Sequence, residues 1–285
     1  MVYVVLMIQT LMASGTHIVA KAVVAAVDPV VLTLTRSLIA SVAMGGLLYL
    51  RGKRPSIARA DYKLLLFLSF LVIPINQFCF LFGMKYTVPS HAALLYATTP
   101  ILVLLFSRVF LGERLAPRKI AGVALGFVGV VIVIFERGLT ASMQYVFGNL
   151  IIFLGVNAWG LYTVFGRNLI LKYGAIGASS ATIIVGTMLF VPIGIVPTWN
   201  FSFENLPLSN WFQISYLGIV TSVFAYYLWY YAIARIEVGK VAVFTNLQPI
   251  LTTILAVLVL GQSITAAFII GGIIAISGVV VAQFG

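Results

Sequence analysis

The sequence predicts an all-α membrane protein with ten transmembrane helices, arranged as two five-helix repeats of inverted topology. Three observations lead to this fold class. The 285-residue chain is 62% hydrophobic and 8% charged, a composition typical of a surface that faces lipid rather than water. Apolar stretches of about 20 residues recur along the chain, each long enough to cross roughly 30 Å of hydrocarbon as a helix. Two stretches also repeat each other at an offset of 149 residues.

The apolar stretches follow one another with short joins. The joins carry Pro or Gly, as in Asp28-Pro29, Val88-Pro89 and Val238-Gly239, which are typical helix boundaries. The apolar runs are continuous and do not alternate, so they indicate helices rather than barrel strands. We expect no cleavable signal peptide, because the first stretch lacks a basic start and a small-residue cleavage site. The expected helix centres are Met12, Ala40, Pro74, Thr99, Val128, Asn157, Gly186, Ser222, Leu251 and Ser277.

The internal repeat predicts the inversion. Pro100-Ile101-Leu102 matches Pro249-Ile250-Leu251, and Gly129-Val130-Val131 matches Gly278-Val279-Val280. Each copy holds five helices, and because five is an odd number the second copy enters the membrane from the opposite face. We therefore expect one repeat at residues 1–143 and an inverted repeat at 144–285. Such repeats commonly place a binding site at their interface near the midplane and rock around it, which is alternating access.

The basic residues predict the orientation. If the helices alternate in direction, 13 of the 17 Lys and Arg residues fall on one side. The positive-inside rule makes this side cytoplasmic, so we expect a multi-pass protein of the plasma (inner) membrane with both termini cytoplasmic. The basic linker at 51–63 corresponds to segment 198–210, which has no Lys or Arg, as inversion predicts. Topology thus explains the net charge of +11, and we expect no nucleic-acid partner.

Polar and aromatic side chains recur at mid-depth in both copies and indicate a substrate cavity. Buried polar groups in hydrocarbon need partners and usually face the bundle interior. Three alternatives stay open. Thr99 and Thr245 could bond their own i−4 carbonyls, and Trp159 and Tyr162 could be ordinary packing. The amides Asn76, Gln77 and Gln248 could form simple interhelical hydrogen bonds. The candidates, from six helices, are Ser14, His17, Asn76, Gln77, Phe80, Tyr96, Thr99, Trp159, Tyr162, Tyr226, Trp229, Thr245 and Gln248.

Proline and glycine recur at matched positions and indicate shared mechanics. Pro100 and Pro249 each remove an intrahelical hydrogen bond and bend a helix, which predicts either a hinge or a static kink. Small residues form a stripe on the fifth helix and another on the tenth, and such stripes permit close helix contact. We expect these helices to form a scaffold or a dimer seam, in a monomer or a homodimer. The stripe residues are Gly122, Gly126, Gly129, Gly271 and Gly278.

The ionisable residues bear on mechanism. All six carboxylates fall at or near expected helix ends, and because buried carboxylates often carry protons or sodium in carriers, we expect facilitated diffusion or exchange instead. His17 is the best proton candidate, with a neutral hydrogen-bonded ring as the alternative. Arg36, about a third of the way into the second helix, is expected to have a structural role or to bind an anionic group. The carboxylates are Asp28, Asp61, Glu113, Glu136, Glu204 and Glu237.

Other function classes fit poorly. Ser14 and His17 lie within one helix turn and the chain has only two histidines, which argues against a protease triad or a zinc site. Cys79 is the single cysteine. The sequence has no Gly-rich phosphate-binding loop of the kind that would indicate ATP hydrolysis. We therefore expect no enzyme activity, no catalytic residue, no metal and no cofactor. A channel-like facilitator is the closer rival; it would leak rapidly and show no counterflow.

Several motifs resemble the EamA-type carriers of the drug/metabolite transporter superfamily, and the resemblance covers essentially the whole chain. The sequence departs from the pattern at Gln262, where a Glu is frequent. The resemblance implies an exporter of amino acids or related small metabolites. A polar, uncharged cavity with aromatic walls suits a zwitterionic or amphipathic compound; an amine, a nucleoside or a drug-like molecule remains an alternative. The motifs include Thr35-Arg36-Ser37-Leu38-Ile39-Ala40, Lys85-Tyr86-Thr87, Leu111-Gly112-Glu113-Arg114-Leu115 and Ala225-Tyr226-Tyr227-Leu228-Trp229-Tyr230-Tyr231-Ala232.

Overall fold

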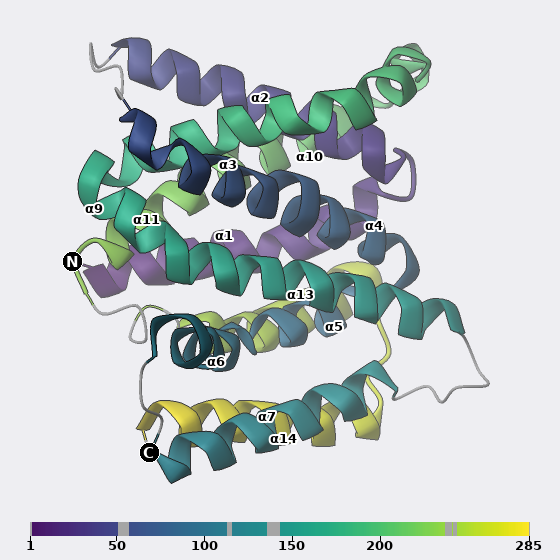
Figure 1. The fold of residues 1–285 in the computed structure, drawn as a ribbon. Helices are drawn as coiled ribbons and strands as arrows, with labels where there is room; N and C mark the ends of the chain where they lie inside the picture. Colours follow the sequence, from purple (N-terminus) through teal and green to yellow (C-terminus); the bar gives the residue numbers. More distant parts are fainter. Residues whose placement is uncertain are drawn as a thin grey trace.

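The computed structural model describes residues 2–50, 57–112, 116–135, 143–236, 241 and 244–284, and these residues form helices without any strand (Figure 1). Seven helical stretches among them are long and apolar enough to cross a membrane, and two shorter apolar helices lie near the C-terminal end. The chain is thus an all-α protein of the kind that its composition predicts. Three of the carboxylates lie outside the described residues: Glu113, Glu136 and Glu237.

The first half of the chain contains α1 to α7. The first two helices are α1 (Val2–Val23) and α2 (Pro29–Leu50). A third stretch runs without interruption through η1 (Arg59–Asp61), α3 (Tyr62–Phe70), the π-helical turns of η2 (Leu71–Gln77) and α4 (Phe78–Tyr86). It is followed by α5 (Pro89–Tyr96), α6 (Thr99–Leu111) and α7 (Pro117–Ile134).

The second half begins with the long helix α9 (Met143–Trp199). Its 57 residues would extend about 85 Å as one straight helix, far more than the roughly 30 Å of a bilayer core. Gly174 interrupts it with φ 75° and ψ 165°, a conformation open essentially to glycine. After η3 (Phe203–Asn205) come α10 (Leu208–Ser215), the π-helical η4 (Tyr216–Ala225), α11 (Tyr226–Ile233), η5 (Phe244–Leu247), α13 (Gln248–Leu260) and α14 (Ala266–Phe284).

Proline and glycine explain where several helices begin and end. Pro29, Pro89 and Pro117 each begin a helix, where the missing N–H has no partner to lose. Gly112 ends α6 and Gly261 ends α13, with φ values of 70° and 62°. This left-handed conformation terminates helices and costs glycine no steric strain.

The helical chain is interrupted just before Pro100 and Pro249, where the sequence predicts a hinge or a static kink. Both prolines lie in the first turn of a helix, α6 and α13 respectively. The preceding helix α5 ends at Tyr96, and the 3₁₀ turn η5 precedes α13. The hinge or static kink at these positions stays a prediction.

Helices α7 and α14 pack side by side at one edge of the molecule (Figure 1). A Cβ atom placed on Gly129 would lie 2.6 Å from both the Cα of Ala275 and the carbonyl oxygen of Gly271. One placed on Gly278 would lie 2.6 Å from the Cα of Gly126. Because the residue number rises along α7 as it falls along α14, the two helices run antiparallel. Their small-residue faces, including Gly122, are thus covered within the chain.

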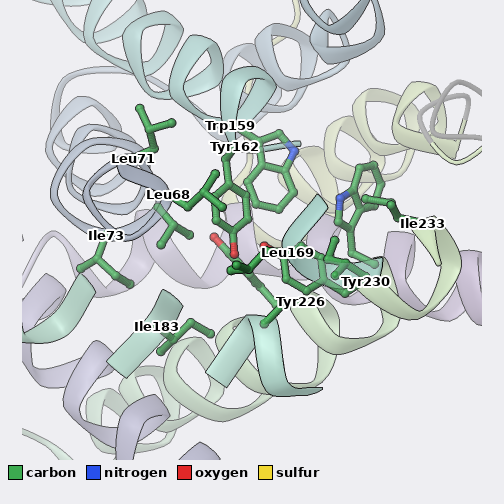
Figure 2. Packing of buried hydrophobic residues seen from close by; sticks show 14 of the residues in the cluster. Leu68, Leu71, Ile73, Trp159, Tyr162, Leu169, Ile183, Tyr226, Tyr230 and Ile233 are labelled. Carbon is green, nitrogen blue, oxygen red and sulfur yellow. The ribbon is translucent and has the colours of Figure 1, made fainter. Parts of the chain in front are cut away.

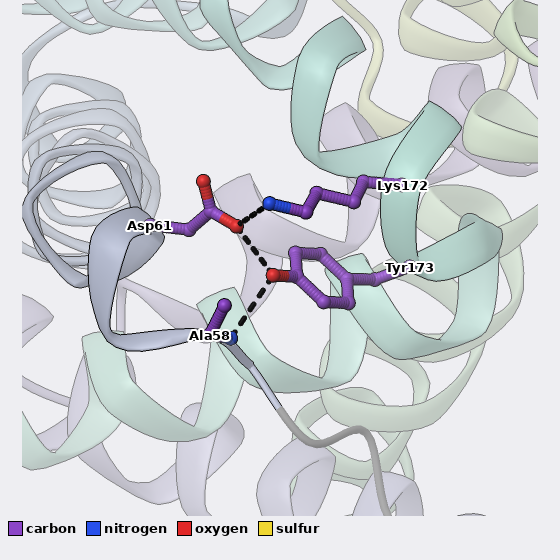
Figure 3. Close-up of polar contacts among 4 residues, drawn as sticks. All are labelled: Ala58, Asp61, Lys172 and Tyr173. Atoms are coloured by element: carbon purple, nitrogen blue, oxygen red, sulfur yellow. Dashed lines mark hydrogen bonds and ion pairs between the residues drawn. The ribbon is translucent and has the colours of Figure 1, made fainter.

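A polar cluster joins the start of α3 to the segment of α9 that precedes Gly174 (Figure 3). The Nζ atom of Lys172 lies 2.6 Å from Oδ2 of Asp61. The hydroxyl of Tyr173 donates to the same carboxylate oxygen and accepts a 3.0 Å hydrogen bond from the backbone N–H of Ala58. In Figure 1, α3 begins toward the left of the view, on the side where α1 also begins and α14 ends.

Candidate functional site

A cavity of about 90 Å³ lies between helices from both halves of the chain. A cavity needs roughly 10–15 Å³ to hold one water molecule, so this cavity has room for a small molecule. Arg36 and ten of the cavity residues expected from sequence line it. The ten are His17, Asn76, Gln77, Phe80, Tyr96, Thr99, Trp159, Tyr226, Trp229 and Gln248.

Helix α1 supplies one wall through Gln9, Ala13, Thr16 and His17. These positions follow the i, i+4, i+7, i+8 spacing of one helix face. The Nδ1 atom of His17 lies 2.8 Å from the carbonyl oxygen of Ala13. A carbonyl oxygen only accepts, so Nδ1 carries the proton, and Nε2 of the neutral ring is a hydrogen-bond acceptor.

Asn76, at the end of η2, connects three other helices. Its Nδ2 donates to the hydroxyl of Tyr96 at 2.7 Å and to the carbonyl oxygen of Gly155 at 2.9 Å. Its Oδ1 accepts from the hydroxyl of Tyr226 at 3.4 Å. The side chain therefore links α5, α9 and α11 around the cavity and satisfies its own buried polar atoms.

Gln77 and Tyr226 meet across the cavity. Nε2 of Gln77 lies 3.5 Å from the hydroxyl of Tyr226, and the two residues are 149 positions apart, which is the offset of the internal repeat. Oε1 of Gln77 has no partner among the described residues.

Aromatic rings form another wall (Figure 2). The ring of Trp159 lies 5.2 Å from that of Tyr226 and 5.7 Å from that of Trp229, measured between centroids. Phe80 and Tyr96 each contact the ring of His17 edge-on. Aromatic rings prefer such edge-to-face pairs.

Two predicted residues, Ser14 and Tyr162, are not among those that line the cavity, and a third cannot be placed from the described residues. Ser14 lies about 100° around α1 from Ala13, and its hydroxyl donates to Thr10 O at 2.9 Å. Tyr162 stacks behind Trp159, and its hydroxyl lies 2.9 Å from Oγ1 of Thr182; it packs in a second layer (Figure 2). The backbone of Thr245 belongs to η5, but its side chain lies outside the described residues.

The helix interruptions at the prolines bring α6 and α13 to the cavity. Thr99 and Gln248 are the first residues of these two helices and both line the cavity. The N-terminal ends of both helices therefore border the cavity. The hydroxyl of Thr99 donates to Tyr96 O at 2.6 Å, which is the i−3 carbonyl and not the i−4 carbonyl of the alternative interpretation.

Sequence reasoning missed Gln9, Ala13, Thr16, Thr221 and Ala225, all of which line the cavity. Gln9 was detectable as an amide within an apolar helix, and its i+4 and i+8 positions would have identified the α1 face. Thr221 and Ala225 belong to the π-helical η4, where the 3.6-residue period does not apply. The hydroxyls of Thr16 and Thr221 lie 2.8 Å apart and join α1 to η4.

Arg36 is the only Lys, Arg, Asp or Glu among the described residues that line the cavity. Its side chain is buried, and Nη2 donates to Oγ of Ser222 at 2.9 Å. The described lining thus holds a guanidinium and no carboxylate. Among the described residues, no group of three or more His, Cys, Asp or Glu side chains lies close enough to hold a metal ion.

These features define a multi-pass helical membrane protein with a polar and aromatic internal cavity. A sequence model of the EamA-like transporter family matches residues 1–135 and 146–283. The chain therefore belongs to this family.

Relatives support the assignment. An uncharacterized transporter of Archaeoglobus fulgidus is 33% identical over 93% of this chain and 91% of its own. The uncharacterized transporter YyaM of Bacillus subtilis is 29% identical over 72% and 67% of the two chains. A probable terminal-alkyne amino-acid exporter of Streptantibioticus cattleyicolor is 25% identical over 87% and 82%. A solved crystal structure matches with a TM-score of 0.73 and 23% identity over 99% of this chain and 96% of that one, which shows a common fold.

Proposed function

We propose that the protein is a secondary transporter that exports or exchanges amino acids, or similar zwitterionic or amphipathic metabolites, across the cytoplasmic membrane. The observation that carries this proposal is the cavity, because it combines polar side chains and aromatic rings from both halves of the chain. The family membership and a relative described as a probable amino-acid exporter support it. We propose no enzyme activity for this chain.

We further propose that the halves are inverted five-helix repeats, at 1–143 and 144–285, and that transport proceeds by alternating access. Three features support this arrangement. The 13-residue helices α6 and α13 begin 149 positions apart and end at left-handed glycines. The π-helical η2 and η4 occupy corresponding places. Finally, α7 and α14, which correspond by the same offset, pack antiparallel, as inverted copies should.

The proposed topology places both termini in the cytoplasm. The start of α1 and the end of α14 lie at the same end of the helices (Figure 1). If the helices alternate in direction, this is the side with 13 of the 17 Lys and Arg residues, and the positive-inside rule makes it cytoplasmic.

We propose facilitated diffusion or exchange as the mode of transport. None of the lining residues is a carboxylate, and proton or sodium carriers commonly use one. Nε2 of His17 has no partner among the described residues, so this ring is the group through which proton coupling would act. Uptake into proteoliposomes that depends on an imposed pH gradient would contradict simple exchange.

Counterflow tests the proposal directly. Proteoliposomes preloaded with one unlabelled L-amino acid should take up the labelled form above the level of protein-free vesicles. Gln77→Ala and Trp159→Ala should each reduce this uptake without preventing membrane insertion, because both side chains line the cavity. Trp199→Ala is the matched control, since this tryptophan is 84% exposed at the end of α9.

The outcomes separate the alternatives. Rapid leak of the preloaded solute without counterflow would indicate a channel-like facilitator. Counterflow of amines or nucleosides without counterflow of amino acids would show that the protein is a carrier with a different substrate. Normal transport by both cavity variants would show that the cavity does not bind the substrate.

A further inference from the structure

Five buried polar atoms of side chains that line the cavity have no hydrogen-bond partner among the described residues. Two are donors, Nε of Arg36 and Nε1 of Trp229. Three are acceptors: Oε1 of Gln9, Oε1 of Gln77 and Nε2 of the neutral His17 ring. Each belongs to a side chain that is more than nine-tenths buried and lines the cavity. Because buried polar groups are normally hydrogen-bonded, this set indicates a ligand with both accepting and donating groups.

The side chain of Arg36 can donate more hydrogen bonds than it makes to the described residues. A guanidinium offers five N–H donors in a planar fork. The described residues give it one hydrogen bond, from Nη2 to Oγ of Ser222, and Ser222 itself donates to the carbonyl oxygen of Leu217 at 2.9 Å. A lysine or glutamine could make the contact with a single serine. Burying a full positive charge without a counter-ion is costly, so a purely structural role does not explain an arginine here.

The geometry points to Arg36 as the residue that selects a carboxylate. We propose, building on the transport function above, that Arg36 pairs with the single carboxylate of the substrate. The guanidinium fork matches the planar carboxylate and can bind it through two parallel hydrogen bonds. The cavity has no second cation among its lining residues, and this favours a monoanionic group over a phosphate or a dicarboxylate.

The unpartnered acceptors indicate which groups the other end of the same ligand carries. Oε1 of Gln9 and Nε2 of His17 are two turns apart on the cavity face of α1, and both are without partners. Oε1 of Gln77 adds a third acceptor from η2. An ammonium carries three donors and no acceptor, so it can donate to acceptors of this set, and the ring faces of Trp159 and Tyr226 also attract a cation. The ligand is thus an α-amino acid held with its carboxylate at α2.

The test compares ligands that differ only in the carboxylate. Purified wild-type protein is heated with each of the 20 L-amino acids and with the corresponding amino-acid amides and decarboxylated amines, and melting temperatures are recorded. At least one amino acid should stabilise the protein, and its amide and amine should bind about 10 to 100 times more weakly, which is the usual effect of losing a hydrogen bond to a charged group. Equal stabilisation by an amide or an amine would overturn the proposal.

The variants then assign this selectivity to Arg36. Arg36→Gln should remove the preference for the acid over its amide, whereas Arg36→Lys should keep part of it. A merely structural role would lower the melting temperature without ligand and leave the acid-to-amide ratio unchanged, and that result would contradict the proposal. Arg118→Gln is the control, because Arg118 is exposed at the start of α7. If Arg36→Gln does not fold, the wild-type ratio and Arg36→Lys still decide the question.

The proposal and the transport function fail in different ways. Counterflow of amines or nucleosides with no response to any amino acid would refute the role of Arg36 and leave the carrier intact. If no compound in the panel stabilises the protein or supports counterflow, both proposals fail.

Discussion

Substitution of Gly129 by alanine tests how closely α7 and α14 pack. The added Cβ would lie 2.6 Å from backbone atoms of Ala275 and Gly271, whereas an ordinary contact of this kind is at least 3.4 Å. The helices must therefore separate by about 1 Å, because the obstructing atoms are backbone and cannot change rotamer. Overpacking of this kind typically costs about 1–3 kcal/mol.

Intrinsic helix propensity acts in the opposite direction, so a control is required. Alanine is favoured over glycine within a helix by about 1 kcal/mol. Gly46→Ala in α2 measures this gain alone, because Gly46 is exposed and a Cβ there would meet nothing within 4 Å.

Thermal unfolding of the detergent-solubilised protein, followed by fluorescence or by loss of the monodisperse peak, provides the assay. For a chain of this size each kcal/mol shifts the melting temperature by about 2–4 °C. Gly46→Ala should melt at or slightly above the wild type, and Gly129→Ala should melt about 2–12 °C below Gly46→Ala, which is the overpacking cost at 2–4 °C per kcal/mol. If Gly129→Ala is as stable as Gly46→Ala, the helices do not make backbone contact and this reasoning is wrong.

Two further predictions concern the break in α9 and the cluster beside it. Gly174→Ala should destabilise the protein by about 1–3 kcal/mol, since its φ of 75° and ψ of 165° are strained for any L side chain; a melting temperature equal to that of Gly46→Ala would contradict this. Asp61→Asn removes the ion pair with Lys172 and weakens the contact with Tyr173. It should lower the melting temperature slightly at low salt and less at high salt, because solvent and salt screen exposed pairs; a salt-independent loss would contradict the assignment.

The helices themselves follow closely from the sequence. Apolar runs of bilayer length and the Pro and Gly residues at their ends locate most of them, because hydrocarbon leaves the backbone few alternatives to a helix. The overlay of the two copies also identified most residues that line the cavity. Asn76, Gln77 and Tyr226, for example, occupy related positions in the two halves and meet in the structure.

The remaining details depend on neighbours that sequence does not reveal. Ser14 and Ala13 are adjacent in sequence, yet a rotation of about 100° separates the side chain that lines the cavity from the one that does not. Tyr162 is aromatic and deep, but the larger ring of Trp159 stands in front of it. The π-helical turns in η2 and η4 alter the helix period locally, so a helical wheel drawn through them assigns the wrong face to Thr221.

The placement of the tryptophans makes the protein its own optical reporter. Two of the four tryptophans, Trp159 and Trp229, line the cavity, whereas Trp199 and Trp211 are 84% and 36% exposed. Indole emission depends on the polarity around the ring, so the native signal combines a cavity component with a peripheral one. Replacing Trp199 and Trp211 by phenylalanine would leave only the cavity component. Emission from that variant would follow occupancy of the cavity without any attached dye.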